Sequence, residues 1–148
     1  MILLNDPEAI RLISHAAKVM WHPTADRCMA SSENGEITGG VIYTDYNYVS
    51  IQMHVAGFKH NWGGRALLYY AFDYPFNKLG VKKIFALVPE INEKALAFDK
   101  NLGFTEETRV RDLFPEGDAI VLSMHRDQCR WLKMRPPKAD FRMTVNGW

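Results

Sequence analysis

The sequence predicts an α+β fold, in which a mixed and mostly antiparallel twisted sheet is flanked by helices. Three strand-like segments come early, at residues 27–32, 37–43 and 49–55, and Asn34-Gly35 between the first two is a strong hairpin signal. A turn containing glycines then leads into a helical run that ends at Gly80, and a buried strand is expected at residues 81–88. A second helix and a closing hairpin around Pro-Glu-Gly-Asp complete this order.

The N-terminal part is expected to be a short apolar strand, residues 1–4, followed by a helix over residues 8–20. Asn5 or Asp6 followed by Pro7 is a helix-start signal. The apolar stripe of this helix consists of Ile10, Ile13, Ala17 and Met20. Pro75 removes one hydrogen bond from the later helical run, so a kink or break is expected there.

Composition sets the bounds for function. The chain has 148 residues, 47% of them hydrophobic, and a formal net charge of +1, which indicates a folded protein and argues against a nucleic-acid partner. Two cysteines and five scattered histidines give no metal-ligand spacing. No apolar run is long enough to span a bilayer and no signal pattern opens the chain. We therefore expect one cytoplasmic domain over residues 1–131, with a C-terminal tail over residues 132–148.

Residues 92–104, "NEKALAFDKNLGF", read as a short capped helix. Asn92 is a good N-cap, and Gly103 can adopt the left-handed conformation that ends a helix. Ala95, Phe98 and Leu102 recur at spacings of three and four, which predicts one buried face.

Residues 60–66, "HNWGGRA", lie between a strand and a helix. Gly63 and Gly64 permit a sharp turn with exposed N–H groups, and the following helix adds its positive dipole end. The loop is either an anion pocket or simply a tight turn. It is not a Walker loop, because no Lys-Ser/Thr pair follows.

Taken together, the two segments resemble the GNAT superfamily of acyl-CoA-dependent N-acetyltransferases. "NWGGRA" fits the phosphate-loop pattern of that superfamily at Asn61, Gly64 and Ala66, and "NEKALAFDKNLGF" fits its second cofactor segment. The resemblance implies a GNAT-like sheet with splayed central parallel strands and a chain that uses acetyl-CoA. The cofactor-binding residues it implies are Met53, Val55, Asn61, Trp62, Gly63, Gly64, Arg65, Ala66, Asn92 and Phe98.

Two residues are predicted to be catalytic. The strand that often carries a glutamate base in this superfamily offers His54, whose reference pKa of about 6.5 suits a base at neutral pH. The alternative for His54 is a structural hydrogen bond to a neighbouring carbonyl. Asp99 occupies the slot of the usual tyrosine acid, where an ionised carboxylate would repel the thiolate unless it is strongly desolvated.

The acceptor is expected to be a primary amine of a small molecule or protein. Its candidate contacts are Trp21, His22, Asp45 and Asp112. A homodimer is a possible assembly. Two alternatives remain open: a non-catalytic acyl-CoA-binding or protein-interaction module on the same fold, and a nucleotide-binding loop in an unrelated α+β domain.

Overall fold

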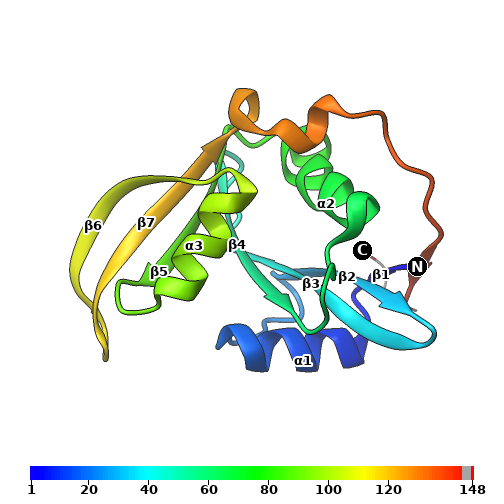
Figure 1. Ribbon diagram of the computed structural model, residues 1–148, viewed down its shortest axis with the longest axis horizontal. Coiled ribbons are helices and arrows are strands. Elements are labelled where there is room, and N and C mark those ends of the chain that lie inside the picture. The colour runs from blue at the N-terminus through cyan, green and yellow to red at the C-terminus, as the bar shows by residue number, and fades with distance from the viewer. Residues whose placement is uncertain (145–147) are drawn as a thin grey trace.

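The computed structural model describes residues 1–144 and Trp148, and residues 145–147 of the predicted tail lie outside the described part (Figure 1). The elements are β1 (Ile2–Leu4), α1 (Pro7–Ala17), β2 (Arg27–Glu33), β3 (Glu36–Thr44), β4 (Ser50–Gly57), α2 (Gly64–Asp73), η1 (Tyr74–Leu79), β5 (Lys83–Pro89), α3 (Glu93–Leu102), β6 (Thr105–Phe114), β7 (Gly117–His125), η2 (Arg126–Gln128), η3 (Arg130–Lys133) and β8 (Phe141–Met143). Within the described residues, no helix is long and apolar enough to cross a membrane.

The strands form one sheet in the order β6-β7-β5-β4-β3-β2-β1-β8. Among the strands of the described residues, the β4/β5 and β1/β8 pairs are parallel and the others are antiparallel. The predicted α+β class and mostly antiparallel sheet are therefore confirmed. Asn34 and Gly35 both have positive φ, 51° and 81°, as the predicted hairpin turn requires.

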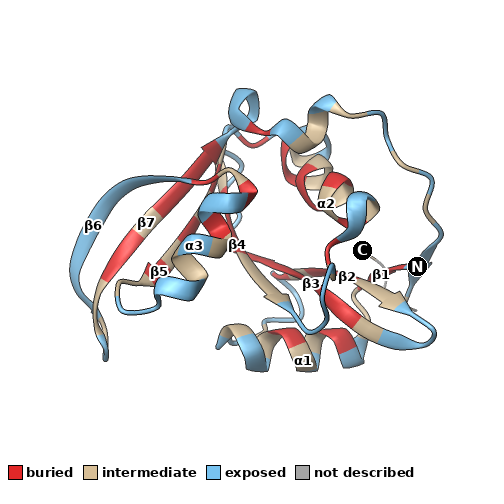
Figure 2. Cartoon of the chain, viewed as in Figure 1, coloured by how far each residue is buried: buried red, intermediate tan, exposed pale blue. Residues whose placement is uncertain are grey.

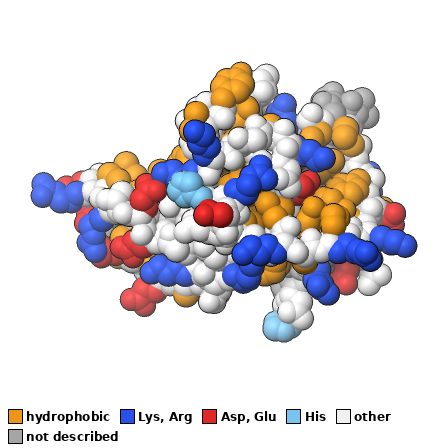
Figure 3. Space-filling model, turned by 90° about the horizontal axis from the view of Figure 1, so that it is seen from above, with side chains coloured by type: hydrophobic (Ala, Val, Ile, Leu, Met, Phe, Trp, Pro, Cys, Tyr) orange, Lys and Arg blue, Asp and Glu red, His pale blue; other side chains and the backbone are white. Residues whose placement is uncertain are grey.

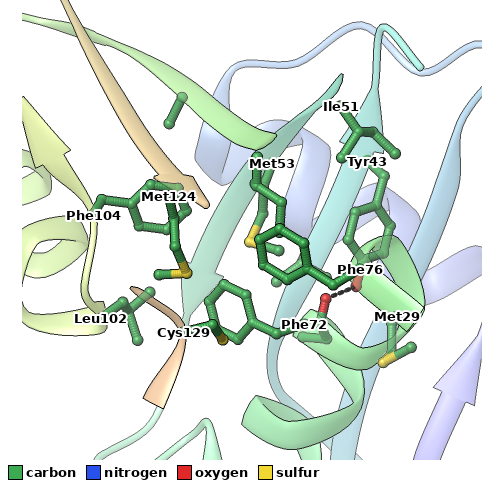
Figure 4. Close-up of a cluster of buried hydrophobic side chains, with 14 of the residues drawn as sticks. Met29, Tyr43, Ile51, Met53, Phe72, Phe76, Leu102, Phe104, Met124 and Cys129 are labelled. Carbon is green, nitrogen blue, oxygen red and sulfur yellow. Dashed lines mark hydrogen bonds between the residues drawn. The ribbon is translucent and has the colours of Figure 1, made fainter. Parts of the chain in front are cut away.

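Helices cover both faces of the sheet (Figure 1). On one face, Ala9 and Ile13 of α1 pack against Cys28, Ala30 and Ile42 of β2 and β3. On the other face, α2 and α3 cover a larger core. Figure 4 shows its side chains converging from several elements: Tyr43, Met53, Phe72, Leu102 and Met124. The Tyr43 hydroxyl donates to the Ala71 carbonyl at 2.6 Å, which ties β3 to α2.

Two predicted helices differ from the structure in detail. α1 ends at Ala17 rather than residue 20, because Lys18 takes the left-handed conformation (φ 56°), and Met20 is 76% exposed. The predicted disruption at Pro75 is a π-helical segment, η1, that continues directly from α2.

The C-terminal segment packs along the domain. The Tyr70 hydroxyl donates to the Pro137 carbonyl at 2.7 Å, and β8 adds a parallel strand beside β1. At the opposite edge, β6 is almost wholly exposed while β7 beside it is largely buried (Figure 2). On the face in Figure 3, basic and acidic side chains are interspersed, in keeping with the near-neutral net charge.

Candidate active site

The two parallel strands at the centre of the sheet separate soon after they meet. β4 and β5 are paired only from Ser50/Lys83 to Gln52/Phe85. β3 stays paired with β4 as far as Gly57, and β7 stays paired with β5 as far as Pro89. Beyond Gln52, no residue of β4 is paired with β5 in the described ladder, so the β5-facing backbone groups of Val55 have no ladder partner there. A V-shaped gap with free N–H and C=O groups can take an extended ligand.

The loop after β4 leads to a helix N-terminus that carries no cap. Gly63 precedes α2 and no side chain caps it, whereas Asp6 caps α1 and Asn92 caps α3. The Trp62 carbonyl accepts from the Ser31 hydroxyl at 2.9 Å, so the Gly63 N–H, on the other side of the same planar peptide, points away from the sheet. The Gly64 N–H donates to the Asn61 carbonyl at 3.3 Å. The Gly63 amide and the positive end of the helix dipole are therefore the groups that favour an anion.

Space is open around this loop. Gly64 has φ +48°, and a Cβ built on it would meet no atom within 4 Å. A pocket of about 380 Å³ lies beside the loop, between residues 61–67 and the β1, β2 and C-terminal segments, and both basic (Arg65, Lys138) and acidic (Glu33, Asp140) residues line it. The loop residues predicted to bind the cofactor, from Asn61 to Ala66, are thus brought together on one pocket wall.

Trp62 and Phe98 join the two arms of the gap. Their rings stack with centroids 5.6 Å apart and an interplanar angle of 28°. The Trp62 indole also lies against Gly39 and Gly57, where any Cβ would collide with it. Asn92 uses its side-chain oxygen to accept from the Ala95 N–H at 3.1 Å, which leaves only its amide nitrogen to donate.

Asp99 lies at the centre of the buried side of α3. It is 8% exposed, between Ala95 and Leu102 on the helix surface that faces the larger core. Among the described residues, no group donates a hydrogen bond to its carboxyl and no charge acts on it. Burial alone raises the pKa of Asp99 from 3.8 to about 7. Asp99 is therefore the desolvated case, in which the carboxyl keeps its proton to a higher pH, because it lies on the helix face that the apolar stripe buries.

His54 lies on the opposite face of β4. Its neighbour Met53 points into the core beneath α2 and α3, so His54 points to the α1 side, beside Ile42. Its Nε2 lies 2.8 Å from the Thr44 hydroxyl. Burial lowers the pKa of His54 to about 4, although the Asp45 charge acts to raise it. The ring is neutral at neutral pH and is a weaker base than the reference value implies.

Of the four predicted acceptor contacts, Asp45 lies close enough to His54 for its charge to act on the ring. His22 and Asp45 both act on the buried Asp26. Asp26 accepts from the His22 N–H at 2.9 Å, and its pKa is raised by burial, with a contribution from the charge of Asp45. Trp21 packs against the α1 core in the same loop. Asp112 is elsewhere: it lies on β6, where its N–H donates to the Asp118 carboxylate at 3.0 Å.

Sequence reasoning missed Thr44 and Asp26. Asp26 is 2% exposed and is linked to His22 and Asp45, whereas Thr44 is 8% exposed and reaches His54 through the packing of β3 on β4. Their only sequence signal is their position at the start of β2 and the end of β3.

No protein-family model matches the sequence, and no curated protein matches it. Solved structures do match, and they show the GNAT fold. A chimera of spermidine N-acetyltransferase SpeG from Vibrio cholerae and hSSAT matches with a TM-score of 0.68 and 20% identity, over 89% of this chain and 99% of that one. A SpeG mutant from Vibrio cholerae matches with a TM-score of 0.70 and 19% identity, over 89% and 95%. A dodecameric SpeG structure from Vibrio cholerae matches with a TM-score of 0.67 and 18% identity, over 86% of this chain and 94% of that one.

The burial of Asp99 predicts a pH-dependent stability. Its folded-state pKa of about 7 lies above the ordinary value of 3.8, so the unfolded chain ionises first as the pH rises. The contribution of Asp99 to the free energy of unfolding is therefore most favourable below about pH 4. It falls as the pH rises to about 7 and is constant above that. A shift of three units corresponds to roughly 4 kcal/mol. Asp99→Asn should match the wild type near pH 4 and be more stable by up to that amount near pH 8.

Urea unfolding of the cofactor-free protein across this pH range measures the difference. Asp127→Asn, at an exposed position, is the matched control and should show no such trend. A constant difference between Asp99→Asn and the wild type at all pH values would contradict the assignment.

Proposed function

We propose that this protein is an N-acetyltransferase that moves an acetyl group from acetyl-CoA to a primary amine of a small molecule. The observation that carries the proposal is the gap between β4 and β5, with His54 on one face of the sheet and Asp99 on the other. The shared fold with spermidine N-acetyltransferases supports it.

The chain offers groups suited to each part of the cofactor. The uncapped N-terminus of α2, with Gly64 and Arg65, suits a pyrophosphate. The backbone of Met53 and Val55 at the opening of the gap and the apolar wall made by Phe98 suit a pantetheine arm. Acetyl-CoA supplies a thioester, an acyl group already activated for transfer.

His54 and Asp99 divide the proton transfers between the two faces. The amine nitrogen attacks the thioester carbonyl, the C–N bond forms and the C–S bond breaks. His54 accepts the proton that the nitrogen loses, and Asp99 donates its proton to the departing sulfur. A carboxyl with a pKa of about 7 is partly protonated at neutral pH and so suits the second role.

The surroundings of His54 favour a cationic amine. The Asp45 charge lies close enough to act on the imidazole, and His22 and Asp26 lie at the same end of the sheet. Spermidine, the substrate in the names of the structural neighbours, is such an amine, so a polyamine is the first acceptor to test.

The weak base at His54 favours a second candidate, an acyl-CoA-binding module without turnover. Thiol release from acetyl-CoA separates the two readings, with spermidine, monoamines and peptide amines as acceptors. The proposed enzyme should release thiol in step with acetylated amine for at least one acceptor. CoA binding without release for any acceptor would favour the binding module, and a lack of CoA binding would reject both.

Gly64→Glu should weaken CoA binding at least tenfold, because it puts a carboxylate where the phosphates are expected and at the positive end of α2. The left-handed φ of +48° adds a strain of about 1 kcal/mol, so the protein should remain folded. Gly80→Glu is the matched control, since Gly80 has φ +73° and equally open space at the far end of η1. Calorimetric titration with CoA measures both variants, and equal dissociation constants for the two would refute the phosphate assignment.

Asp99→Asn should lower turnover about a hundredfold, because an amide cannot supply the proton. The ratio of wild-type to variant rates should shrink as the pH rises above about 7, where the wild-type carboxyl ionises. Taking the ratio cancels the titration of the amine itself. The measurement is thiol release at saturating acetyl-CoA, and a ratio near one at all pH values would remove Asp99 from the mechanism.

A further inference from the structure

We propose that Thr44 and Asp45 are positioning residues that hold His54 in the tautomer required of a general base. This inference rests on the proposed acetyl transfer, in which His54 accepts the proton of the amine. It concerns a chain of hydrogen bonds from Asp45 through Thr44 to the imidazole ring.

The direction of the chain follows from its members. The Thr44 hydroxyl lies 2.8 Å from the Asp45 Oδ2 and 2.8 Å from the His54 Nε2. A carboxylate only accepts, so the single hydroxyl proton of Thr44 goes to Asp45. The Thr44 oxygen is then left to accept, and the group that donates to it is the His54 Nε2–H.

This arrangement fixes the reactive nitrogen. With the proton held on Nε2, the lone pair of His54 is on Nδ1. Within the described part of the chain, no group donates to Nδ1. His54 stands two residues beyond Gln52, the last β4 residue paired with β5, so its ring flanks the start of the gap.

The same chain stabilises the ring once Nδ1 has taken a proton. The Thr44 oxygen, polarised by the Asp45 carboxylate, then accepts from a cationic ring, as the acid of a catalytic triad does directly. Among the described residues, Asp45 is the one charged side chain that acts on the ring, and it acts to raise the pKa that burial lowers. Asp45 holds a left-handed φ of 56°, a conformation uncommon outside glycine, in the loop that brings its carboxylate to Thr44.

A double-mutant cycle on thiol release tests the connection. His54→Ala should lower turnover about a hundredfold. Thr44→Val should lower kcat at least tenfold in the wild-type background but have no further effect when His54 is already alanine. Thr44→Ser, which keeps the hydroxyl, should restore most of the rate. Thr105→Val removes a hydroxyl that bonds the Ser123 carbonyl at the far edge of the sheet and should leave turnover unchanged.

The ring tautomer gives a readout that does not depend on activity. Nitrogen chemical shifts of the imidazole should show the proton on Nε2 of His54 in the wild type and in Thr44→Ser, and a mixture of tautomers in Thr44→Val. Thermal melts confirm that each variant is folded.

Three outcomes would overturn the inference: a wild-type ring protonated on Nδ1, equal losses from Thr44→Val in both backgrounds, or no loss from His54→Ala. Each of them is compatible with acetyl transfer by the wild type. A wild type that releases no thiol with any amine, yet shows the expected tautomers, would instead count against the proposed function alone.

Discussion

The separation of β4 and β5 is the constraint on which the rest of the structure depends. β4 stays paired with β3 from Gln52 to Gly57 and β5 stays paired with β7 from Lys83 to Pro89, so the two strands separate from each other while each keeps its outer neighbour. Unpaired backbone groups in the middle of a sheet are costly unless something else binds them. The stacked rings of Trp62 and Phe98 join the two arms at the same level as the uncapped N-terminus of α2. The gap, the loop and α3 are therefore one unit and not three separate features.

Burying Asp99 in this unit lowers the stability of the protein. An apolar residue at its position would extend the stripe of Ala95 and Leu102 and stabilise α3 against the sheet. The chain instead keeps a carboxyl that burial holds partly protonated and that has no partner among the described residues. Stability is commonly given up in this way at functional sites. The unexplained burial of an acid is thus the strongest local sign that α3 does more than cover the sheet.

The sequence was most informative where backbone geometry is set by one or two residues. Asn34 and Gly35 form the predicted hairpin turn, and Asn92 and Gly103 bound α3, because turns and helix ends depend on local dihedrals and caps. The order of the elements then predicted the class of sheet. The surroundings of His54 were not predictable in the same way. Thr44 is ten residues away in the chain, and only the register of β3 on β4 brings it within hydrogen-bond distance. Asp99 lies on the same helix face as the apolar stripe that predicted the helix, so its burial follows from that stripe. A carboxylate is not expected at a buried position, and this is why the stripe alone did not predict it.

The groups proposed as base and acid, His54 and Asp99, are not equally suited to the proton transfers of the proposed reaction. A carboxyl with a pKa near 7 exchanges its proton readily at neutral pH, whereas an imidazole with a pKa near 4 gains little by taking one. A cationic amine also has to lose a proton before its nitrogen can attack. In the proposed reaction, the base side is therefore the weaker of the two, even with the Asp45 charge acting on His54. In the described structure no other charge does so, and the hydroxyl of Thr44 is the group through which Asp45 reaches the ring.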